Sequence, residues 1–126
     1  MARNEQFDPL SFEMQGLIGE GTTLSGELDF RGAYRVDGRI VGRVSCSSTL
    51  VVGPPGRLEI DELRAASLVV SGSVEGTIEL RDRLEIAEGG RVRGRVTLAS
   101  PGFVLARGAS FEGTIVMRSG TSDSNG

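Results

Sequence analysis

The sequence contains no histidine, no tryptophan and no lysine, and all 14 of its basic side chains are arginine. Without histidine there is no imidazole for acid–base catalysis, for a Ser-His or Cys-His nucleophile pair, or for metal ligation. Without lysine there is no Walker A phosphate-binding lysine and no Schiff base. We therefore expect a protein that is not an enzyme, with no catalytic site, no metal site and no bound cofactor.

Cysteine, net charge and long apolar runs are also scarce. Cys46 is the single cysteine, so no internal disulfide forms and nothing requires an oxidising compartment. No apolar run approaches the roughly 18 residues of a membrane span, and the N-terminus lacks the apolar core of a signal peptide. The net charge of -3 argues against direct nucleic-acid binding. These features predict a cytoplasmic protein of one domain.

Glycine, in contrast, is abundant, with 19 of 126 residues, and it recurs in the pattern apolar-x-Gly-x-apolar. The segment Leu58–Leu63 falls in the largest gap between copies and carries Ile60 where glycine is expected. This is the signature of a repeat protein, and six coils are predicted. The copies are Leu24–Leu28, Val36–Ile40, Val74–Ile78, Val92–Val96 and Phe111–Ile115.

Short apolar strands precede the later copies, and their starts lie 16 to 22 residues apart. Such repeats are too short for helical hairpins, and their connections carry glycine. The pattern predicts an all-β protein, a β-solenoid in which each coil stacks about 4.8 Å above the previous one. The recurring glycines are interpreted as bends at coil corners. The short strands are Leu28–Phe30, Leu50–Val52, Leu68–Val70, Leu84–Ile86 and Phe103–Leu105.

Charged residues between the apolar positions are predicted to form ladders on the outside. Arg39 stacks over Asp61, and Arg93 lies between Glu75 and Glu112. We interpret these ladders as a solvated face that supports register and solubility.

The carboxylate pairs and the cysteine are also interpreted without a catalytic or binding role. The pairs Asp61-Glu62 and Glu85/Glu88 are read as solvated charge rather than catalytic dyads. Cys46 is interpreted as a small residue in a coil connection, without a redox or metal role.

The repeat block resembles the bactofilins, a bacterial family of polymer-forming cytoskeletal proteins. The resemblance rests on Leu17-Ile-Gly-Glu-Gly-Thr-Thr-Leu-Ser-Gly-Glu-Leu28, on Tyr34-Arg-Val-Asp-Gly-Arg-Ile-Val-Gly-Arg-Val44 and on the later Val-x-Gly-x-Ile copies, and it covers roughly residues 17–117. It implies a right-handed parallel β-helix that polymerises end to end, without nucleotide, into non-polar filaments. It also implies a location beneath the cytoplasmic membrane and recruitment of partners in cell shape, cell-wall synthesis or chromosome positioning.

Assembly is also expected from the fold itself, because a solenoid without caps exposes unpaired strand edges and apolar interior at both ends. We expect a flexible tail over residues 1–16, a β-helix over 17–117 and a disordered tail over 118–126. Two sets of candidate contact residues follow. The candidate polymer interface is Leu17, Ile18, Leu24, Phe103, Leu105, Phe111, Ile115 and Met117. The candidate membrane contact is Phe7, Leu10, Phe12 and Met14.

One other class of function stays open on the sequence. The chain could be a β-solenoid adaptor that does not polymerise and binds a membrane-associated or cell-wall partner protein. Sedimentation separates the two, since filaments pellet without nucleotide and an adaptor stays in the supernatant.

Overall fold

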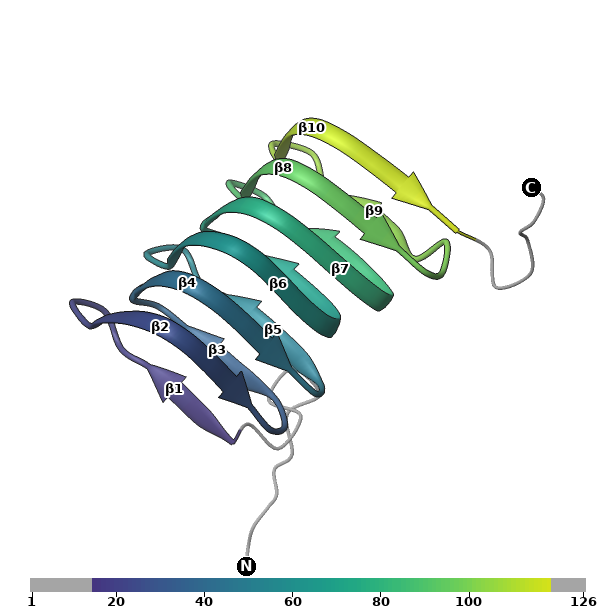
Figure 1. Ribbon diagram of the computed structural model, residues 1–126. Coiled ribbons are helices and arrows are strands. Elements are labelled where there is room, and N and C mark those ends of the chain that lie inside the picture. The colour runs from purple at the N-terminus through teal and green to yellow at the C-terminus, as the bar shows by residue number, and fades with distance from the viewer. Residues whose placement is uncertain (1–14, 119–126) are drawn as a thin grey trace, which may run out of the picture.

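The computed structural model describes residues 15–118 as a parallel β-solenoid that contains no helix in this range (Figure 1). The predicted all-β solenoid is thereby confirmed. The predicted tails lie almost entirely outside the described residues. The strands are β1 (Gly16–Ile18), β2 (Thr23–Phe30), β3 (Tyr34–Val36), β4 (Arg39–Cys46), β5 (Thr49–Val52), β6 (Arg57–Val70), β7 (Ser73–Ile86), β8 (Arg91–Leu98), β9 (Phe103–Leu105) and β10 (Ser110–Met117).

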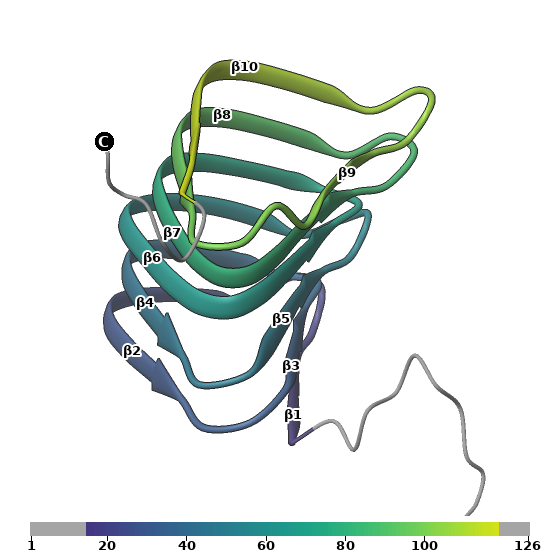
Figure 2. The same cartoon turned by 90° about the vertical axis from the view of Figure 1, so that its right-hand side faces the viewer.

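Each coil consists of a short strand followed by a longer strand that bends, so the solenoid has three sides (Figure 2). Face A is formed by the short strands β1, β3, β5 and β9 together with the last residues of β6 and β7. Face B is formed by the long strands before their bend, and face C by the same strands after it. Counted along the chain, six coils stack in parallel register, as predicted.

The interior is a continuous apolar column because inward positions alternate with outward ones along every strand. No polar or charged residue of the described chain is buried. The inward parity assigned from the sequence to the short strands is confirmed for the middle coils. The core side chains with no more than 1% exposure include Val36, Ile40, Leu50, Val52, Leu58, Leu63, Leu68, Val70, Ile78, Leu80, Leu84, Ile86, Val92, Val96 and Leu98.

The corner between faces B and C is built from a column of glycines. Gly42, Gly76, Gly94 and Gly113 all have positive φ, between 129° and 138°, which residues with a side chain rarely adopt. A Cβ at any of them would meet the backbone carbonyl oxygen of the residue stacked in the preceding coil. The predicted bend is confirmed, but the side chain is excluded mainly by the neighbouring coil's backbone rather than by the interior.

The third coil turns this corner without glycine. Ile60 pairs with Gly42 of the preceding coil, and the register of β6 shifts just after it on both of its neighbours. Leu58 pairs with Val74 and Leu63 pairs with Ile78, so β6 uses one residue more than β7 over this stretch. The bulge around Asp61 provides the bend that a positive φ provides elsewhere.

A second glycine column lies at the corner between faces A and B; the sequence pattern placed Gly38 in the repeat and the other glycines in connections, but did not recognise them as one column. It consists of Gly38, Gly56, Gly72 and Gly90, where a Cβ would again meet carbonyl oxygens. The backbone amide after each glycine donates to the residue stacked in the preceding coil, as from Arg57 to the Gly38 carbonyl at 2.9 Å. Both corners therefore depend on close backbone stacking.

Two register assignments from the sequence are wrong near the start of the repeat. Gly26 of the first coil stacks on Gly42, not on Gly38, so the second copy of the repeat is Ile40–Val44 rather than Val36–Ile40. The segment Leu28–Phe30 is the end of β2 and pairs with Val44–Cys46, whereas the short strand of that region is β3. The error is one of phase, and the number of coils is unaffected.

Candidate assembly surfaces at the ends of the solenoid

The first-coil end is formed by β1 and β2. In the described residues these strands pair only with β3 and β4, so one backbone edge of each has no strand beside it. Ile18, Leu24 and Leu28 point inward from this coil and pack on the core, yet they are only partly buried. The first coil thus presents a free hydrogen-bonding edge with apolar side chains behind it.

The last-coil end has the same character. Within the described range β9 pairs only with β7, and β10 only with β8. Phe103, Phe111 and Ile115 are partly buried against the core. Leu105 and Met117, which continue buried inward columns, are each 48% exposed. Equivalent side chains in the middle coils are covered, so the exposure arises from the missing next coil.

Seven of the eight residues predicted for the polymer interface lie at these two ends with inward parity. Leu17 differs, because it stacks on Arg35 in an outward-facing column of face A and is 62% exposed. Val104, which the sequence reasoning missed, occupies the last position of the same column and is 40% exposed. The candidate membrane residues Phe7, Leu10, Phe12 and Met14 lie outside the described residues.

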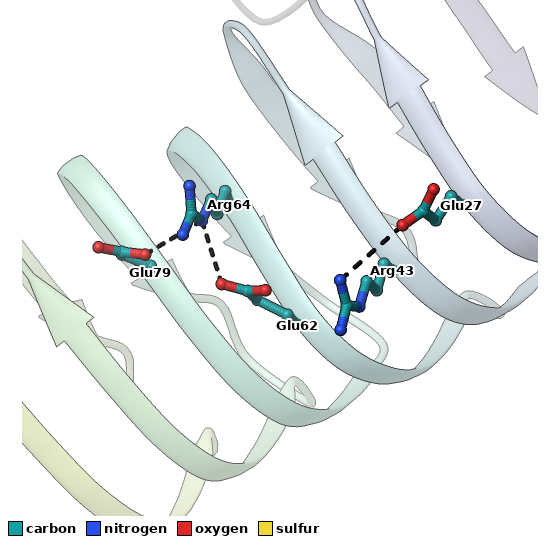
Figure 3. Close-up of polar contacts among 5 residues, drawn as sticks. All are labelled: Glu27, Arg43, Glu62, Arg64 and Glu79. Atoms are coloured by element: carbon teal, nitrogen blue, oxygen red, sulfur yellow. Dashed lines mark hydrogen bonds and ion pairs between the residues drawn. The ribbon is translucent and has the colours of Figure 1, made fainter.

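Charged side chains form ladders across coils on the outer surface of face C (Figure 3). Arg43 lies 3.8 Å from Glu27 of the coil before it, and Arg64 contacts Glu62 at 3.1 Å and Glu79 of the next coil at 3.3 Å. All five side chains are at least 36% exposed, so water screens these pairs and each adds little to stability. These pairs are not among those predicted from the sequence, which named Arg39 with Asp61 and Arg93 with Glu75 and Glu112.

Face B carries a shorter ladder. Arg39 pairs with Glu59 at 2.8 Å rather than with the predicted Asp61, because the register of the repeat was assigned four residues too early. This hydrogen bond lowers the pKa of Glu59 and raises that of Arg39. The predicted contact between Arg93 and Glu112 is confirmed at 3.6 Å.

The carboxylates considered as dyads have other partners. Glu62 bonds to Arg64, and Glu85 accepts a hydrogen bond from Arg83 at 3.1 Å. Both pairs lie on the outer surface, which agrees with their interpretation as solvated charge. Among residues 15–118 no group of three His, Cys, Asp or Glu side chains is arranged to hold a metal ion.

Known proteins are similar to this chain in sequence and in fold. A comparison with protein families matches residues 16–116 to the family described as "Bactofilin: Polymer-forming cytoskeletal". The chain belongs to the bactofilin family. The match covers every strand of the solenoid except the last residue of β10.

Individual bactofilins support the assignment. Bactofilin BacP of Myxococcus xanthus is 31% identical over 101 residues, which are 80% of this chain and 41% of BacP. The matched region thus spans less than half of BacP. Bactofilin BacO of the same organism is 29% identical, and the match covers 80% of this chain and 78% of BacO.

A solved bactofilin structure has the same fold. It is a cryo-EM reconstruction of double helical filaments of the Thermus thermophilus bactofilin, with 27% sequence identity and a TM-score of 0.75. The match covers 80% of this chain and 97% of that chain. The bactofilin family is a cytoskeletal family by its description, which places this chain among structural proteins.

The described residues of this bactofilin contain no helix that is long and apolar enough to cross a membrane.

Cys46 is a core residue of this bactofilin, not part of a coil connection as the sequence suggested. It is the last residue of β4, it is 4% exposed, and its Sγ–H donates to the Gly32 carbonyl at 3.2 Å. Burial raises the pKa of its thiol, so the reactive thiolate is scarce at neutral pH.

We expect Cys46 to react with a thiol-specific disulfide reagent at least about tenfold more slowly in the folded protein than in denaturant, because reaction requires local opening. Absorbance of the released thiolate measures the rate. A Thr77→Cys variant, whose added thiol would lie at an exposed position, is the control and should show one fast and one slow thiol. Fast reaction of wild-type protein would contradict the buried, unreactive assignment.

Proposed function

We propose that this bactofilin assembles end to end into cytoskeletal filaments without nucleotide. The observation that carries the proposal is that, within residues 15–118, both ends of the solenoid combine unpaired strand edges with partly exposed core side chains. The family description and the filaments of the Thermus thermophilus relative support it.

The ends are well matched for such a contact. Each presents a strand of 3 residues and a strand of 8 residues, β1 and β2 at one end and β9 and β10 at the other. Stacking a second subunit would pair backbone groups along these strands and remove Leu105 and Met117 from water. Backbone pairing would fix the orientation and register of the two subunits, and burial of apolar side chains would supply most of the free energy of association. Head-to-tail and two-fold contacts both satisfy these requirements.

The test uses the purified full chain in buffer without nucleotide or divalent metal. Sedimentation should place most of the protein in the pellet, and negative-stain electron microscopy should show filaments there. Addition of ATP or GTP should change neither result. Protein that stays in the supernatant as a monomer would reject the filament proposal and favour the adaptor.

In the cell, we propose a scaffold in the cytoplasm, at the inner face of the membrane, that recruits proteins of cell-shape, cell-wall or chromosome-positioning systems. Family membership supports the scaffold role. The candidate membrane residues Phe7, Leu10, Phe12 and Met14 are apolar, and a filament would present many copies of them, which strengthens a weak contact. Filaments that fail to float with anionic lipid vesicles would reject the membrane contact.

A further inference from the structure

Face A carries an outward column that differs from the charged faces B and C. The column takes the middle residue of each short strand, so one residue per coil stacks on the next. Four of its six members are apolar although they point away from the core. From the first coil to the last, the column is Leu17, Arg35, Val51, Val69, Glu85 and Val104.

Most positions that flank this column are small; Asp37 in the second coil and Arg83 in the fifth are larger, charged exceptions. Thr49 and Ser67 lie on one side of the column in the middle coils, and neither projects as a large side chain. On the other side the neighbours in coils three to six are Gly53, Ser71, Ala87 and Ala106, whose amides donate along the same ladder. A sheet face with an apolar stripe between mostly small residues is the type of surface that packs on a second sheet at about 10 Å.

The two charges in the column have opposite signs and symmetric places. Arg35 is in the second coil from one end, and Glu85 is in the second coil from the other. If a second copy faces this one with its coil order reversed, Arg35 of each copy lies opposite Glu85 of the other. The same reversal places Leu17 opposite Val104 and Val51 opposite Val69. With equal coil order, Arg35 would face Arg35 and Glu85 would face Glu85, which is unfavourable.

We propose that face A is the lateral contact between two strands of the filament, in which a second copy of this chain packs with its coil order reversed. Two symmetry-related pairs of Arg35 with Glu85 flank an apolar centre of Val51 and Val69. The inference rests on the proposed function, because two filament strands can pair only if the chain first assembles end to end.

The polar atoms needed for these pairs remain available. Arg35 uses its Nε toward Asp37 at 3.0 Å, which leaves its terminal nitrogens for a partner. Glu85 accepts from Arg83 through one carboxylate oxygen and keeps the other. Arg83 and Asp37 lie on opposite sides of the column, so the reversed packing brings neither onto a like charge. Face A thus matches itself in charge when the coil order is reversed.

The area of face A is large enough to hold two filament strands together but too small to hold two single subunits together. Six coils of about 4.8 Å and a width of about five residues at about 3.3 Å each give roughly 480 Å² per copy, or about 950 Å² for a pair. Stable dimers usually bury about 1,200 Å² or more. One face is therefore too small, but a strand repeats it in every subunit, and the contacts add along the filament.

Charge reversal tests the contact. In Arg35→Glu, the introduced carboxylate would oppose Glu85 of the other copy, and we expect filaments to persist as single strands with loss of the paired form in electron micrographs. Combining it with Glu85→Arg exchanges the two charges and should restore pairing. The matched control is Arg31→Glu, an exposed arginine that also has an acidic neighbour two residues away, Asp29 at 3.7 Å, and it should leave pairing unchanged. Paired strands in Arg35→Glu would overturn the inference.

Cross-linking gives an independent test of orientation. A mixture of Arg35→Cys and Glu85→Cys filaments, disassembled and reassembled together, should give covalent dimers with a short bismaleimide. Arg35→Cys alone should give at least about tenfold fewer, because the reversed packing sets its two thiols three coils, about 14 Å, apart along the axis. Wild type, with only the buried Cys46, sets the background. Equal dimer yield from Arg35→Cys alone would indicate equal coil order and reject the proposal. Wild-type filaments that are single strands would reject it and leave the proposed function intact, whereas absence of any polymer would reject both.

Discussion

Replacing Met117 by glutamate is expected to abolish filaments and leave a folded monomer. Met117 lies in the inward column of the last coil and is 48% exposed, so a carboxylate there meets water in the monomer. In an end-to-end contact the same carboxylate would be buried without a partner, which costs about 3 kcal/mol or more. That cost raises the critical concentration for assembly at least about a hundredfold. Sedimentation over a concentration series measures it.

Thr114→Glu is the matched control, because it adds the same charge to an exposed outward position of the same strand. It should sediment like wild type. Leu105→Glu tests the second exposed side chain of this end and should behave like Met117→Glu. Phe103 and Phe111 are less suitable targets, since both pack on the core and a charge there would also destabilise the monomer. Unchanged filaments in Met117→Glu and Leu105→Glu would place the subunit contact elsewhere.

Gly94→Val is expected to destabilise the solenoid itself. Gly94 has φ of 133°, and a Cβ would meet the Gly76 carbonyl oxygen and lie 2.9 Å from the Gly76 carbonyl carbon. The strained backbone costs about 1 to 3 kcal/mol, and separating two stacked coils adds the loss of hydrogen bonds. We expect the midpoint of thermal unfolding, followed by circular dichroism, to fall by about 10 °C or more.

Gly89→Ala separates the two causes. Gly89 also has positive φ, 82°, but nothing lies within 4 Å of an added Cβ. Its replacement should cost only about 1 kcal/mol, the penalty of the backbone conformation alone. Equal destabilisation by Gly94→Ala and Gly89→Ala would show that close stacking of the coils adds nothing to the glycine requirement at the corner.

The fold could be predicted from the sequence because each coil repeats the same physical requirement. Inward apolar residues alternate with outward polar ones, and glycine recurs where a corner must stack closely on the coil before it. That combination specified six parallel coils and the inward columns that end at Phe111 and Ile115. The ends of the solenoid could be predicted as candidate contacts for the same reason, since the pattern simply stops there.

The phase of the second coil could not be predicted, because the segment from Val36 to Val44 satisfies the repeat twice. Gly38 and Gly42 both have apolar residues two positions before and after them. Only the backbone conformation distinguishes the two glycines. Gly42 has a positive φ and stacks on Gly26 at the corner between faces B and C, whereas Gly38 lies at the corner between faces A and B. The same ambiguity gave Arg39 the wrong partner. Face A was missed although the short strands from Leu50–Val52 onward were placed in the correct register, because only their inward residues were compared between coils.

The strands of this protein run across the long axis of the solenoid, so the backbone hydrogen bonds between coils run along it (Figure 1). A pull along the axis loads all the bonds between two coils together, as it does in the cross-β spine of an amyloid fibril. A sideways force opens one edge first and breaks the bonds in turn. A filament with this architecture would therefore resist tension and bending while it could still be peeled apart from an end. Its mechanical strength would be set at the subunit junctions, where the covalent chain no longer links one coil to the next.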